Sequence, residues 1–389
     1  MGLVVIERCT DYDDERVYNT VCRAVDRLGG IEKYIKQGMR VALKPNLVKK
    51  KNPGEAATTH PSVVKAVARL VREAGGIATI VESPGGFFTL TSLKSVYSVC
   101  GIEKAAMEAG AELNYNLYEV DVENPEGMYL KKVTVLKALA EADVIINLPK
   151  LKTHGQMAYT GAVKNMFGAV PGELKAEYHV RMPGYAEFAN ALIDIYLSMK
   201  PSLNIMDAVV GMDGAGPTAG NPKQMGFLLA GEDGFEVDFT ALRLVGVDPL
   251  HIPIINQAVK RNLCPAAFEE IKVDCDNFES FMVDGFHMPQ LDTLKAIMYY
   301  DRGIMKFIIN MLKPSPVFRH DICISCGECV KICPAKVIRM KNNKPGMNIK
   351  DCIRCFCCQE LCPAKAVHIK RPVLLDFYLR CRKKARHKQ

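Results

Sequence analysis

Cysteine is concentrated near the end of this chain, in two runs of the same form. Nine of the 15 cysteines lie between Cys323 and Cys362. The run "CISCGECVKICP" has C-x2-C-x2-C-x3-C-P spacing, and "CIRCFCCQELCP" repeats that spacing 29 residues later. Because the N-terminus carries no export signal, this clustering favours metal ligation over disulfides. The eight cysteines of the repeat are Cys323, Cys326, Cys329, Cys333, Cys352, Cys355, Cys358 and Cys362.

Two such runs are typical of a bacterial-type ferredoxin domain that holds two [4Fe–4S] clusters. Three thiolates from one loop can bind three irons of a cube, and the fourth thiolate then comes from the opposite run. Pro334 and Pro363 end the two runs by breaking the local helix. The expected ligands are Cys323, Cys326, Cys329 and Cys362 for the first cluster, and Cys352, Cys355, Cys358 and Cys333 for the second.

Zinc is the alternative metal for four thiolates. It is disfavoured because zinc sites rarely come as two matched runs that both end in Cys-Pro. Cys357 falls outside the repeat, and we expect it to be a packed thiol with no ligand role. Clusters of this kind move single electrons, so the domain predicts electron transfer and a redox partner protein. Their oxygen sensitivity suggests an anaerobic host.

Charge divides the chain at about the same place. Residues 314–389 hold 17 Lys and Arg against 5 Asp and Glu, whereas residues 1–313 hold 34 against 38. The basic excess indicates either an acidic partner surface or an electrostatic offset to the negative clusters. The terminal "RCRKKARHKQ" reads as a solvated tail, and without interleaved aromatic residues it does not favour nucleic-acid binding.

The remaining composition is that of an ordinary protein with a sizeable core. The chain has 389 residues, of which 49% are hydrophobic and 24% charged. No apolar run reaches the ~18 residues that span a bilayer. The N-terminal "MGLVVIERCTDYDDER" has no basic region and turns acidic at once, unlike a signal peptide. We therefore expect a cytoplasmic protein.

Residues 1–290 alternate strand and helix patterns. Apolar strand patterns fall at 40–48, 77–86, 142–148, 202–220 and 225–246, and "HPSVVKAVARLVREAGG" has helical spacing with Pro61 in its first turn. This alternation predicts an α/β fold with a mostly parallel sheet and helices on both faces. A small α+β ferredoxin-like domain would follow at 318–372. Residues 291–317 would form a connecting helix and linker, and 373–389 a basic tail.

The connecting segment contains "DTLKAIMYYDRGIMKFIINMLK", residues 292–313, which reads as one long apolar-rich helix. Packing against the two domains explains its composition. Peripheral contact with a membrane or with a partner is the alternative.

Polar residues follow the strands of the predicted sheet again and again. Any one of these lysines, taken alone, is best interpreted as a solvated surface residue. Ligands of open α/β sheets, however, bind beyond the carboxyl ends of the strands, where all of these polar residues would lie. Taken together, they predict a shared site. Lysines and the "SPGG" loop suit phosphate or carboxylate groups. Neither a Walker loop nor a dinucleotide fingerprint is present. The set is Lys44, Asn46, Glu82, Ser83, Gly85, Gly86, Lys150, Lys152, His154, Asp207, Asp213, Gly214 and Asp233.

A metal is the alternative ligand of this edge. Three histidines and three carboxylates could contribute to it, although their spacings match no metal motif. They are His60, His154, His179, Glu82, Asp207 and Asp213.

The motifs "ALKPNLV", "ATTHPSVVKAV", "VESPGG", "NLPKLKTH", "TGAVKNMFGAVPG", "MDAVVGMDGAGPTAG" and "AGEDGFEVD" resemble domain of unknown function family 362, over roughly residues 1–260. Members occur in bacteria and archaea, often with an appended ferredoxin module, here matched at roughly 318–370. The resemblance implies no settled reaction. The positions that it marks are Lys44, Asn46, Thr59, His60, Glu82, Lys150, Lys152, His154, Lys164, Asn165, Asp213, Gly214 and Asp233.

These features predict an iron–sulfur oxidoreductase. The ferredoxin module would pass electrons to a small anionic substrate or cofactor, a flavin among the options, bound at the strand edge. His154 would donate the proton, because its reference pKa near 6.5 suits general acid work. Lys152, Lys164 and His60 complete the candidate catalytic set, the lysines stabilising negative charge on the reduced substrate.

Two other functions compete with this prediction. The first is a non-catalytic electron-transfer or assembly protein, in which the α/β domain docks a partner enzyme or times electron delivery. The second is a non-redox metallocofactor enzyme that uses the clusters structurally.

Overall fold

The computed structural model describes residues 2–288, 291 and 313–370. The predicted helix over 292–313 and the basic tail therefore lie almost wholly outside the described residues. No helix in the described ranges has both the length and the apolar character needed to cross a membrane.

The large domain is built on one twisted sheet. Within the described residues it has ten strands, eight of them in a continuous order. β8 and β9 form a hairpin off this path, and β8 pairs with the outer half of β10. The order is β12 (Lys272–Asp274), β1 (Leu3–Arg8), β11 (Asn221–Gly231), β10 (Leu203–Asp213), β7 (Val144–Leu148), β2 (Arg40–Pro45), β3 (Ile77–Ile80) and β4 (Glu112–Leu113), with β8 (Lys150–His154) and β9 (Ala158–Thr160) beside β10.

Most neighbouring strands are parallel, as predicted. β10, β7, β2, β3 and β4 form one continuous parallel group. Within the continuous order of eight strands, β11 is the exception, because it pairs antiparallel with both β10 and β1; off that path, β8 and β9 also pair antiparallel. The carboxyl end of β11 consequently lies at the opposite edge of the sheet from the carboxyl ends of the parallel group.

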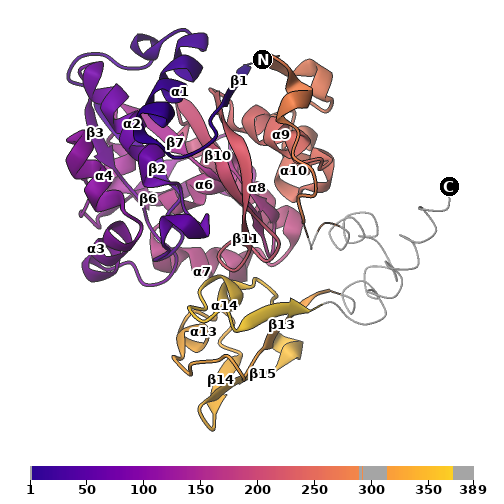
Figure 1. Ribbon diagram of the computed structural model, residues 1–389. Coiled ribbons are helices and arrows are strands. Elements are labelled where there is room, and N and C mark those ends of the chain that lie inside the picture. The colour runs from indigo at the N-terminus through magenta and orange to yellow at the C-terminus, as the bar shows by residue number, and fades with distance from the viewer. Residues whose placement is uncertain (1, 289–290, 292–312, 371–389) are drawn as a thin grey trace, which may run out of the picture.

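Helices cover both faces of the sheet, which confirms the predicted α/β fold (Figure 1). One core lies under α1 (Asp14–Arg27), α2 (Pro61–Glu73), α3 (Leu90–Val99) and α4 (Ile102–Ala109). The other lies under α8 (Tyr185–Met199), α9 (Gly234–Leu244) and α10 (Pro253–Lys260). The remaining elements of this domain are the hairpin β5 (Glu119–Glu123) and β6 (Lys132–Leu136), with α5 (Lys137–Ala140), α6 (Ala162–Asn165) and α7 (Gly172–Arg181).

Local sequence explains why α2 begins where it does. The ring of His60 caps the helix by accepting a hydrogen bond from the backbone N–H of Ser62, and Pro61 occupies the first turn. Its valines recur at helical spacing and are buried against the sheet. α2 therefore carries the chain back under the sheet, so that β3 can pair parallel to β2.

The small domain, as far as the structure describes it, contains two short two-stranded antiparallel sheets and two one-turn helices. β13 (Ser315–Phe318) pairs with β16 (Val367–Lys370), and β14 (Ile338–Lys341) pairs with β15 (Lys344–Met347). The helices are α13 (Glu328–Lys331) and α14 (Cys357–Glu360). Its two halves share backbone geometry: Ser325 and Arg354, 29 residues apart, both have positive φ, as do Lys336 and Lys365. The sequence repeat is thus also a structural repeat.

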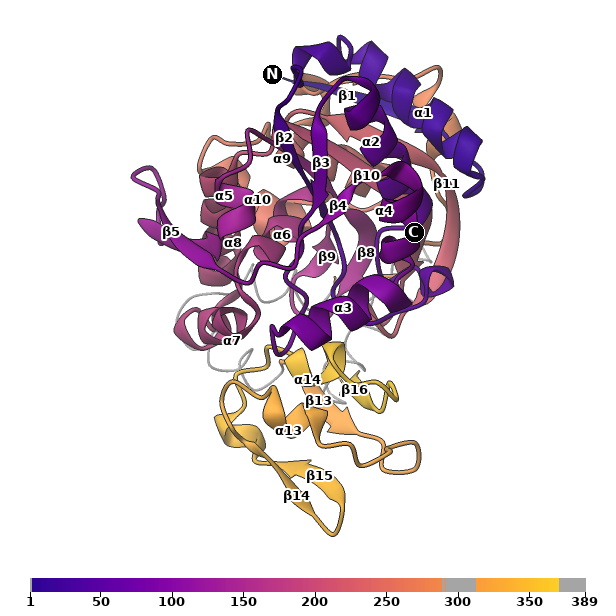
Figure 2. The same ribbon diagram turned by 90° about the vertical axis from the view of Figure 1, so that its left-hand side faces the viewer.

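α14 lies against the large domain, whereas β14 and β15 lie at the far end (Figure 2). The Gln359 amide donates to the carbonyl of Ala215 at 2.9 Å, and the Thr218 hydroxyl donates to the carbonyl of Glu360 at 2.7 Å. The ammonium of Lys49 also donates to the carbonyl of Leu361. Hydrogen bonds from both sides therefore hold α14 in place.

Candidate functional site

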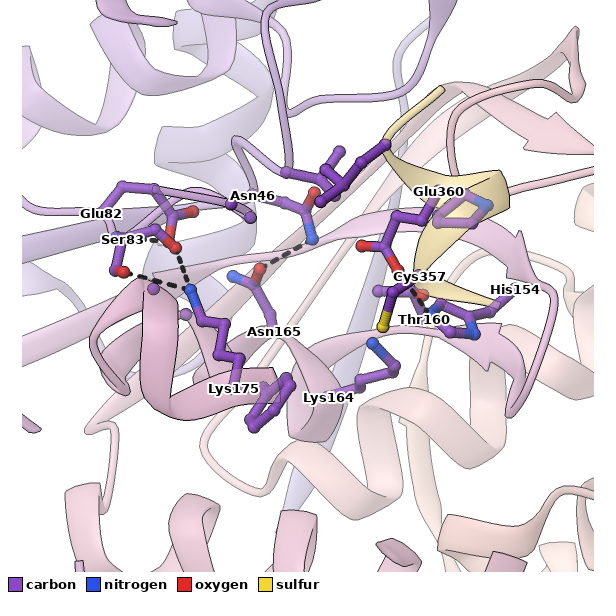
Figure 3. Close-up of a pocket in the computed structure, with 18 of the residues that line it drawn as sticks. Asn46, Glu82, Ser83, His154, Thr160, Lys164, Asn165, Lys175, Cys357 and Glu360 are labelled. Atoms are coloured by element: carbon purple, nitrogen blue, oxygen red, sulfur yellow. Dashed lines mark hydrogen bonds and ion pairs between the residues drawn. The ribbon is translucent and has the colours of Figure 1, made fainter. Parts of the chain in front are cut away.

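A cavity lies between the strand edge of the large domain and α14 (Figure 3). It has about 760 Å³ of empty space, including the part that is open to solvent. Ten residues predicted for the strand-edge site line it. They are Lys44, Asn46, Glu82, Ser83, Gly85, Gly86, Lys152, His154, Lys164 and Asn165.

The floor of the cavity is a buried ion pair. The ammonium of Lys44 lies 3.0 Å from a carboxylate oxygen of Glu82, and neither side chain exceeds 3% exposure. Glu82 also accepts hydrogen bonds from the N–H groups of Leu47 and Ser83, at 2.9 and 2.8 Å. Because these contacts satisfy both charges, the pair supports the cavity and leaves little capacity for a ligand.

The "SPGG" loop does not form the anion seat that its sequence suggests. The N–H of Ser83 is bonded to Glu82 and to the carbonyl of Gly168, and the N–H of Gly85 donates to the carbonyl of Val48 at 2.9 Å. Two of the loop's donors are thus used within the protein. The loop closes one side of the cavity through its shape, and α3 begins only at Leu90.

A chain of buried amides positions Lys152. The amide of Asn165 donates to Asn147 at 2.7 Å, and the amide of Asn46 donates to Asn165 at 2.9 Å. The ammonium of Lys152 donates to the Asn46 side-chain oxygen at 2.8 Å and to the carbonyl of Ala57 at 2.5 Å. Burial lowers the pKa of Lys152 to about 7. Its proton is therefore exchangeable near neutral pH.

His154 is fixed in one tautomer. Its Nδ1 accepts hydrogen bonds from the N–H groups of Gln156 and Met157, at 3.1 and 3.2 Å, so Nε2 carries the hydrogen. Nε2 lies 3.6 Å from the carboxylate of Glu360. Burial, with the charge of Lys164, lowers the pKa of His154 to about 4. The ring is therefore neutral near pH 7 and faces the cavity as a hydrogen-bond donor.

Two lysines enter the cavity from the segment after β9. The ammonium of Lys164 makes no hydrogen bond or ion pair with another described residue and lies 5.8 Å from the ring centre of Phe167. Burial lowers the pKa of Lys164. Lys175 donates to the hydroxyl of Ser83 at 3.1 Å, and burial lowers its pKa to about 7. The two side chains make this end of the cavity suitable for an anion.

Glu360 brings a carboxylate from the small domain into this basic cavity (Figure 3). Burial acts to raise its pKa. Contact with His154 and the charges of Lys164 and Lys152 outweigh burial and hold the pKa of Glu360 well below its usual range. The carboxylate is thus a permanent negative charge beside the lysines.

Several buried polar atoms of the wall lack a hydrogen-bond partner among the described residues. They include Nε2 of His154, Oγ1 of Thr160 and Nδ1 of His179. All three side chains line the cavity and are less than 10% exposed. An unpaired buried polar atom costs about 1–3 kcal/mol, so such atoms are normally paired. Their grouping on one wall indicates a site that binds a hydrogen-bonding molecule.

The eight repeated cysteines surround two further cavities in the small domain. The grouping is the crosswise one expected for the two clusters, and ligation itself stays a prediction. Backbone N–H groups also approach the sulfurs: Ala366 donates to Cys362 at 3.2 Å and Arg354 to Cys352 at 3.4 Å, a common feature of thiolate clusters. These residues fit the predicted clusters. One cavity is lined by Cys323, Cys326, Cys329 and Cys362, and the other by Cys333, Cys352, Cys355 and Cys358.

Some predicted residues form a separate buried cluster away from the cavity. Lys150 contacts Asp207 and the hydroxyl of Tyr12, at 2.8 and 2.7 Å. The ring of His60 stacks on Tyr12 with centroids 3.6 Å apart. Thr59 donates to the carbonyl of Leu148 at 2.6 Å. Lys150, His60 and their partners thus form a packing and capping cluster, while Thr59 also accepts a hydrogen bond from the N–H of Asn46 at 2.8 Å and so supports the backbone behind the cavity. None of these predicted residues lines the cavity.

Three more predicted residues also lie elsewhere. Asp213 and Gly214 pair with the backbone of His287, because β10 bends away from the parallel group and joins β8 and β11. Asp233 caps α9 by accepting from the N–H groups of Phe235 and Glu236. It follows the antiparallel β11, so it lies at the opposite edge of the sheet. Predicting Asp233 for the shared site was wrong for that reason.

The metal alternative at the strand edge gains no support from geometry. At the strand edge, among the residues that the structure describes, no three His, Cys, Asp or Glu side chains are grouped to hold a single metal ion. His60 and His154 lie in different clusters, and Asp207 is paired with Lys150.

Sequence reasoning missed part of the cavity wall. Thr160 is the first residue of the quoted motif "TGAVKNMFGAVPG" and Lys175 follows that motif, but only the position of α7 over the cavity shows that Lys175 belongs to it. Cys357 and Glu360 belong to the other domain, so no strand-edge argument could find them. Cys357 is buried, as expected for a packed thiol. Its thiol faces the cavity near Lys164 (Figure 3), while its lack of a ligand role stays a prediction.

The comparisons agree with this division of the chain. The model of "Domain of unknown function (DUF362)" matches residues 41–243, and that of a "4Fe-4S dicluster domain" matches residues 315–363. A thylakoid-associated protein of Synechocystis sp. is 31% identical over 311 residues, which is 80% of this chain and 93% of that protein.

Two solved structures are more distant. The lactate racemase apoprotein of Thermoanaerobacterium thermosaccharolyticum is 13% identical, with a TM-score of 0.34 over 58% of this chain and 54% of that one. A Thermotoga maritima protein is 12% identical, with a TM-score of 0.34 over 65% and 59%. The family matches cover both domains, and the chain therefore belongs to the DUF362 family and carries a ferredoxin-type 4Fe-4S dicluster domain at its C-terminal side.

Proposed function

We propose that this protein is an iron–sulfur oxidoreductase that acts on an anionic ligand bound in the cavity beside α14. One observation carries the proposal: the cavity wall includes residues next in sequence to predicted ligands of both clusters. Cys357 precedes Cys358, and Leu361 precedes Cys362. When bound, the [4Fe–4S] clusters supply single electrons next to this wall.

The cavity residues supply recognition of an anion. Lys164 and Lys175 offer positive charge, and Nε2–H of His154 and the hydroxyl of Thr160 offer unpaired donors. Apolar side chains such as Phe167 limit water around the ligand, which strengthens these contacts. A molecule rich in hydrogen-bond acceptors, such as a carboxylate or a phosphate ester, matches this lining.

Lysines of the cavity, and not His154 as the sequence suggests, supply the protons in this proposal. His154 is neutral and donates a hydrogen bond, so it holds the ligand in place of giving up a proton. Lys152 and Lys175 have pKa values lowered by burial to about 7, so either can hold and release a proton near neutral pH. Each electron delivered to the ligand could then be matched by a proton from a lysine.

The test uses the full chain, purified without oxygen and reduced with dithionite. After the excess dithionite is removed, the recovery of visible cluster absorbance is followed while carboxylates, phosphate esters and flavin mononucleotide are added one by one. We expect one class to speed reoxidation, and any molecule that copurifies, identified by mass spectrometry, to belong to that class.

Matched variants locate the reaction in the cavity. Lys164→Met and Lys175→Met should slow the accelerated reoxidation at least tenfold, because each removes a charge that faces the ligand. Lys104→Met should not, since Lys104 is 79% exposed on α4. Equal rates in all three variants would refute the cavity as the site. About eight irons per chain, with no bound anion and no active acceptor, would instead favour electron delivery to a partner enzyme.

A further inference from the structure

Lys164 differs from the other lysines of the cavity wall. Lys44, Lys152 and Lys175 each donate hydrogen bonds to fixed protein acceptors. The ammonium of Lys164 makes no hydrogen bond or ion pair with another described residue, and it lies 5.8 Å from the ring centre of Phe167. The residue is partly exposed, in contrast to Lys152. A molecule in the cavity can therefore reach this amine.

The surroundings of Lys164 favour the neutral form of its amine more than water does. Burial lowers the pKa of this lysine, and the negative charge of Glu360 only partly opposes the shift. Only the neutral amine can attack an electron-poor carbon, and a lysine desolvated in this way is a good nucleophile toward carbonyl compounds. Lys164 is thus equipped for a second task besides attracting an anion.

Two hydrogen-bond donors on the same side of the cavity also lack a partner (Figure 3). They are the Nε2–H of His154 and the hydroxyl of Thr160, both buried, and neither has a hydrogen-bond partner among the described residues. When an amine attacks a carbonyl group, negative charge develops on the oxygen, and donors placed there lower the barrier. A spare amine and two spare donors are the groups that addition to a carbonyl requires.

The carboxylate of Glu360 has a place in the same reaction. An imine that forms from a lysine ammonium carries a positive charge, and a permanent negative charge nearby stabilises it. Glu360 supplies such a charge, and its attraction already acts on Lys164. The same carboxylate would repel the carboxylate of a ligand and leave that group to Lys175, which lies beside Ser83 and away from Glu360 (Figure 3). A site that only bound anions would have no use for this acid.

We propose that Lys164 forms an imine with an α-oxo acid bound in the cavity. The inference rests on the proposed function for the location of the site, and it names the class of the ligand. The carbonyl carbon of the ligand forms a bond to Nζ, the carbonyl oxygen leaves as water with two hydrogens of the ammonium, and a protonated imine results. No electron is gained or lost in this step. The protonated imine withdraws electrons from the neighbouring carbon more strongly than the carbonyl did, which prepares the ligand to accept an electron.

The test traps the imine in the full chain with both clusters oxidised, so that no electron transfer takes part. The protein is incubated without oxygen at slightly alkaline pH with pyruvate, a simple α-oxo acid, and with sodium cyanoborohydride, which converts an imine to a stable secondary amine. Peptide mass spectrometry then gives the labelling rate of each lysine. Lys104, which is 79% exposed on α4, reports the rate of an ordinary lysine in the same sample. We expect Lys164 to be labelled roughly tenfold faster than Lys104.

A neutral ketone and two variants separate the parts of the site. Acetone has the carbonyl group without the carboxylate, so the preference for pyruvate over acetone should be greater at Lys164 than at Lys104. Thr160→Val keeps the shape of the side chain and removes its hydroxyl, so labelling of Lys164 should slow severalfold. Lys164→Arg keeps the positive charge but has no reactive amine, and no other lysine of the cavity should take over the fast labelling.

Three results would overturn the inference. One is a labelling rate at Lys164, or a preference for pyruvate there, that is no greater than at Lys104. Another is fast labelling that persists at Lys175 in Lys164→Arg. The third is unchanged labelling of Lys164 in Thr160→Val, which would remove the argument for a carbonyl ligand.

The proposed function fails separately, because the trapping needs no electrons. An imine at Lys164, without any anion that speeds reoxidation of the clusters, would refute only the oxidoreductase. Faster reoxidation with an anion, without an imine, would refute only the inference about Lys164.

Discussion

Replacing Lys152 with methionine should change how the stability of the protein depends on pH. Lys152 is 1% exposed, and burial lowers its pKa from 10.5 to about 7. In the unfolded chain the lysine keeps its proton up to about pH 10.4. Between these values the unfolded state binds more protons than the folded state, so this residue makes the free energy of unfolding rise with pH.

The magnitude follows from linkage. Each pH unit inside this window is worth about 1.4 kcal/mol for one proton, so Lys152 adds about 2 kcal/mol between pH 7.5 and 9. Below pH 7 the folded state holds a buried charge, at a cost of order 5 kcal/mol relative to a lysine in water. A methionine side chain has no titrating group. The hydrogen bonds lost with the lysine therefore shift the free energy of unfolding of the variant by a constant amount, and they do not change how the difference from the wild type varies with pH.

The assay is urea unfolding without oxygen, followed by tyrosine fluorescence at several pH values. Lys152→Met should be more stable than the wild type at pH 6, and the difference should shrink by about 1.4 kcal/mol per pH unit above pH 7. The matched control Lys104→Met should show a constant difference, because Lys104 is exposed. A difference for Lys152→Met that does not vary with pH would refute the assignment of a depressed pKa to this lysine.

Three further predictions concern other parts of the structure. Gly168→Ala should lower the free energy of unfolding, measured in urea, by about 1–3 kcal/mol, because the added methyl group would overlap the buried pair of Lys44 and Glu82. The control Gly346→Ala should be neutral, because the space around Gly346 is open. Cys358→Ser should reduce the iron content from about eight to about four per chain, and Cys357→Ser should keep both clusters, as measured by iron analysis and electron paramagnetic resonance. Gln359→Ala should loosen α14, since it loses a 2.9 Å hydrogen bond, and should speed hydrogen exchange at residues 215–218.

Much of the fold follows from the sequence, because burial imposes regular patterns. α2 has valines at helical spacing and Pro61 in its first turn, and β7 is a fully buried, mainly apolar run between two parallel neighbours. The direction of β11 does not follow from its own residues. The turn after β10 sends it back antiparallel, a consequence of local chain geometry that apolar patterning does not encode.

The candidate site was predictable only in part, for a related reason. Lys152, His154 and Lys164 follow a buried strand, so their place at the sheet edge could be inferred from order alone. Whether a lysine faces a ligand or an internal partner depends on long-range contacts. Lys150 pairs with Asp207, 57 residues away, while Glu360 reaches the cavity from another domain.

The hydrogen bonds that hold α14 against the large domain have a kinetic consequence. An electron carrier that diffuses freely must find its acceptor anew for every electron, at a rate set by its concentration. The hydrogen bonds of Gln359 and Thr218 keep α14 beside the cavity. The small domain and the large domain therefore meet at a fixed effective concentration that dilution of the protein does not change. A two-electron reaction in the cavity could therefore receive its second electron without a second encounter between the two domains.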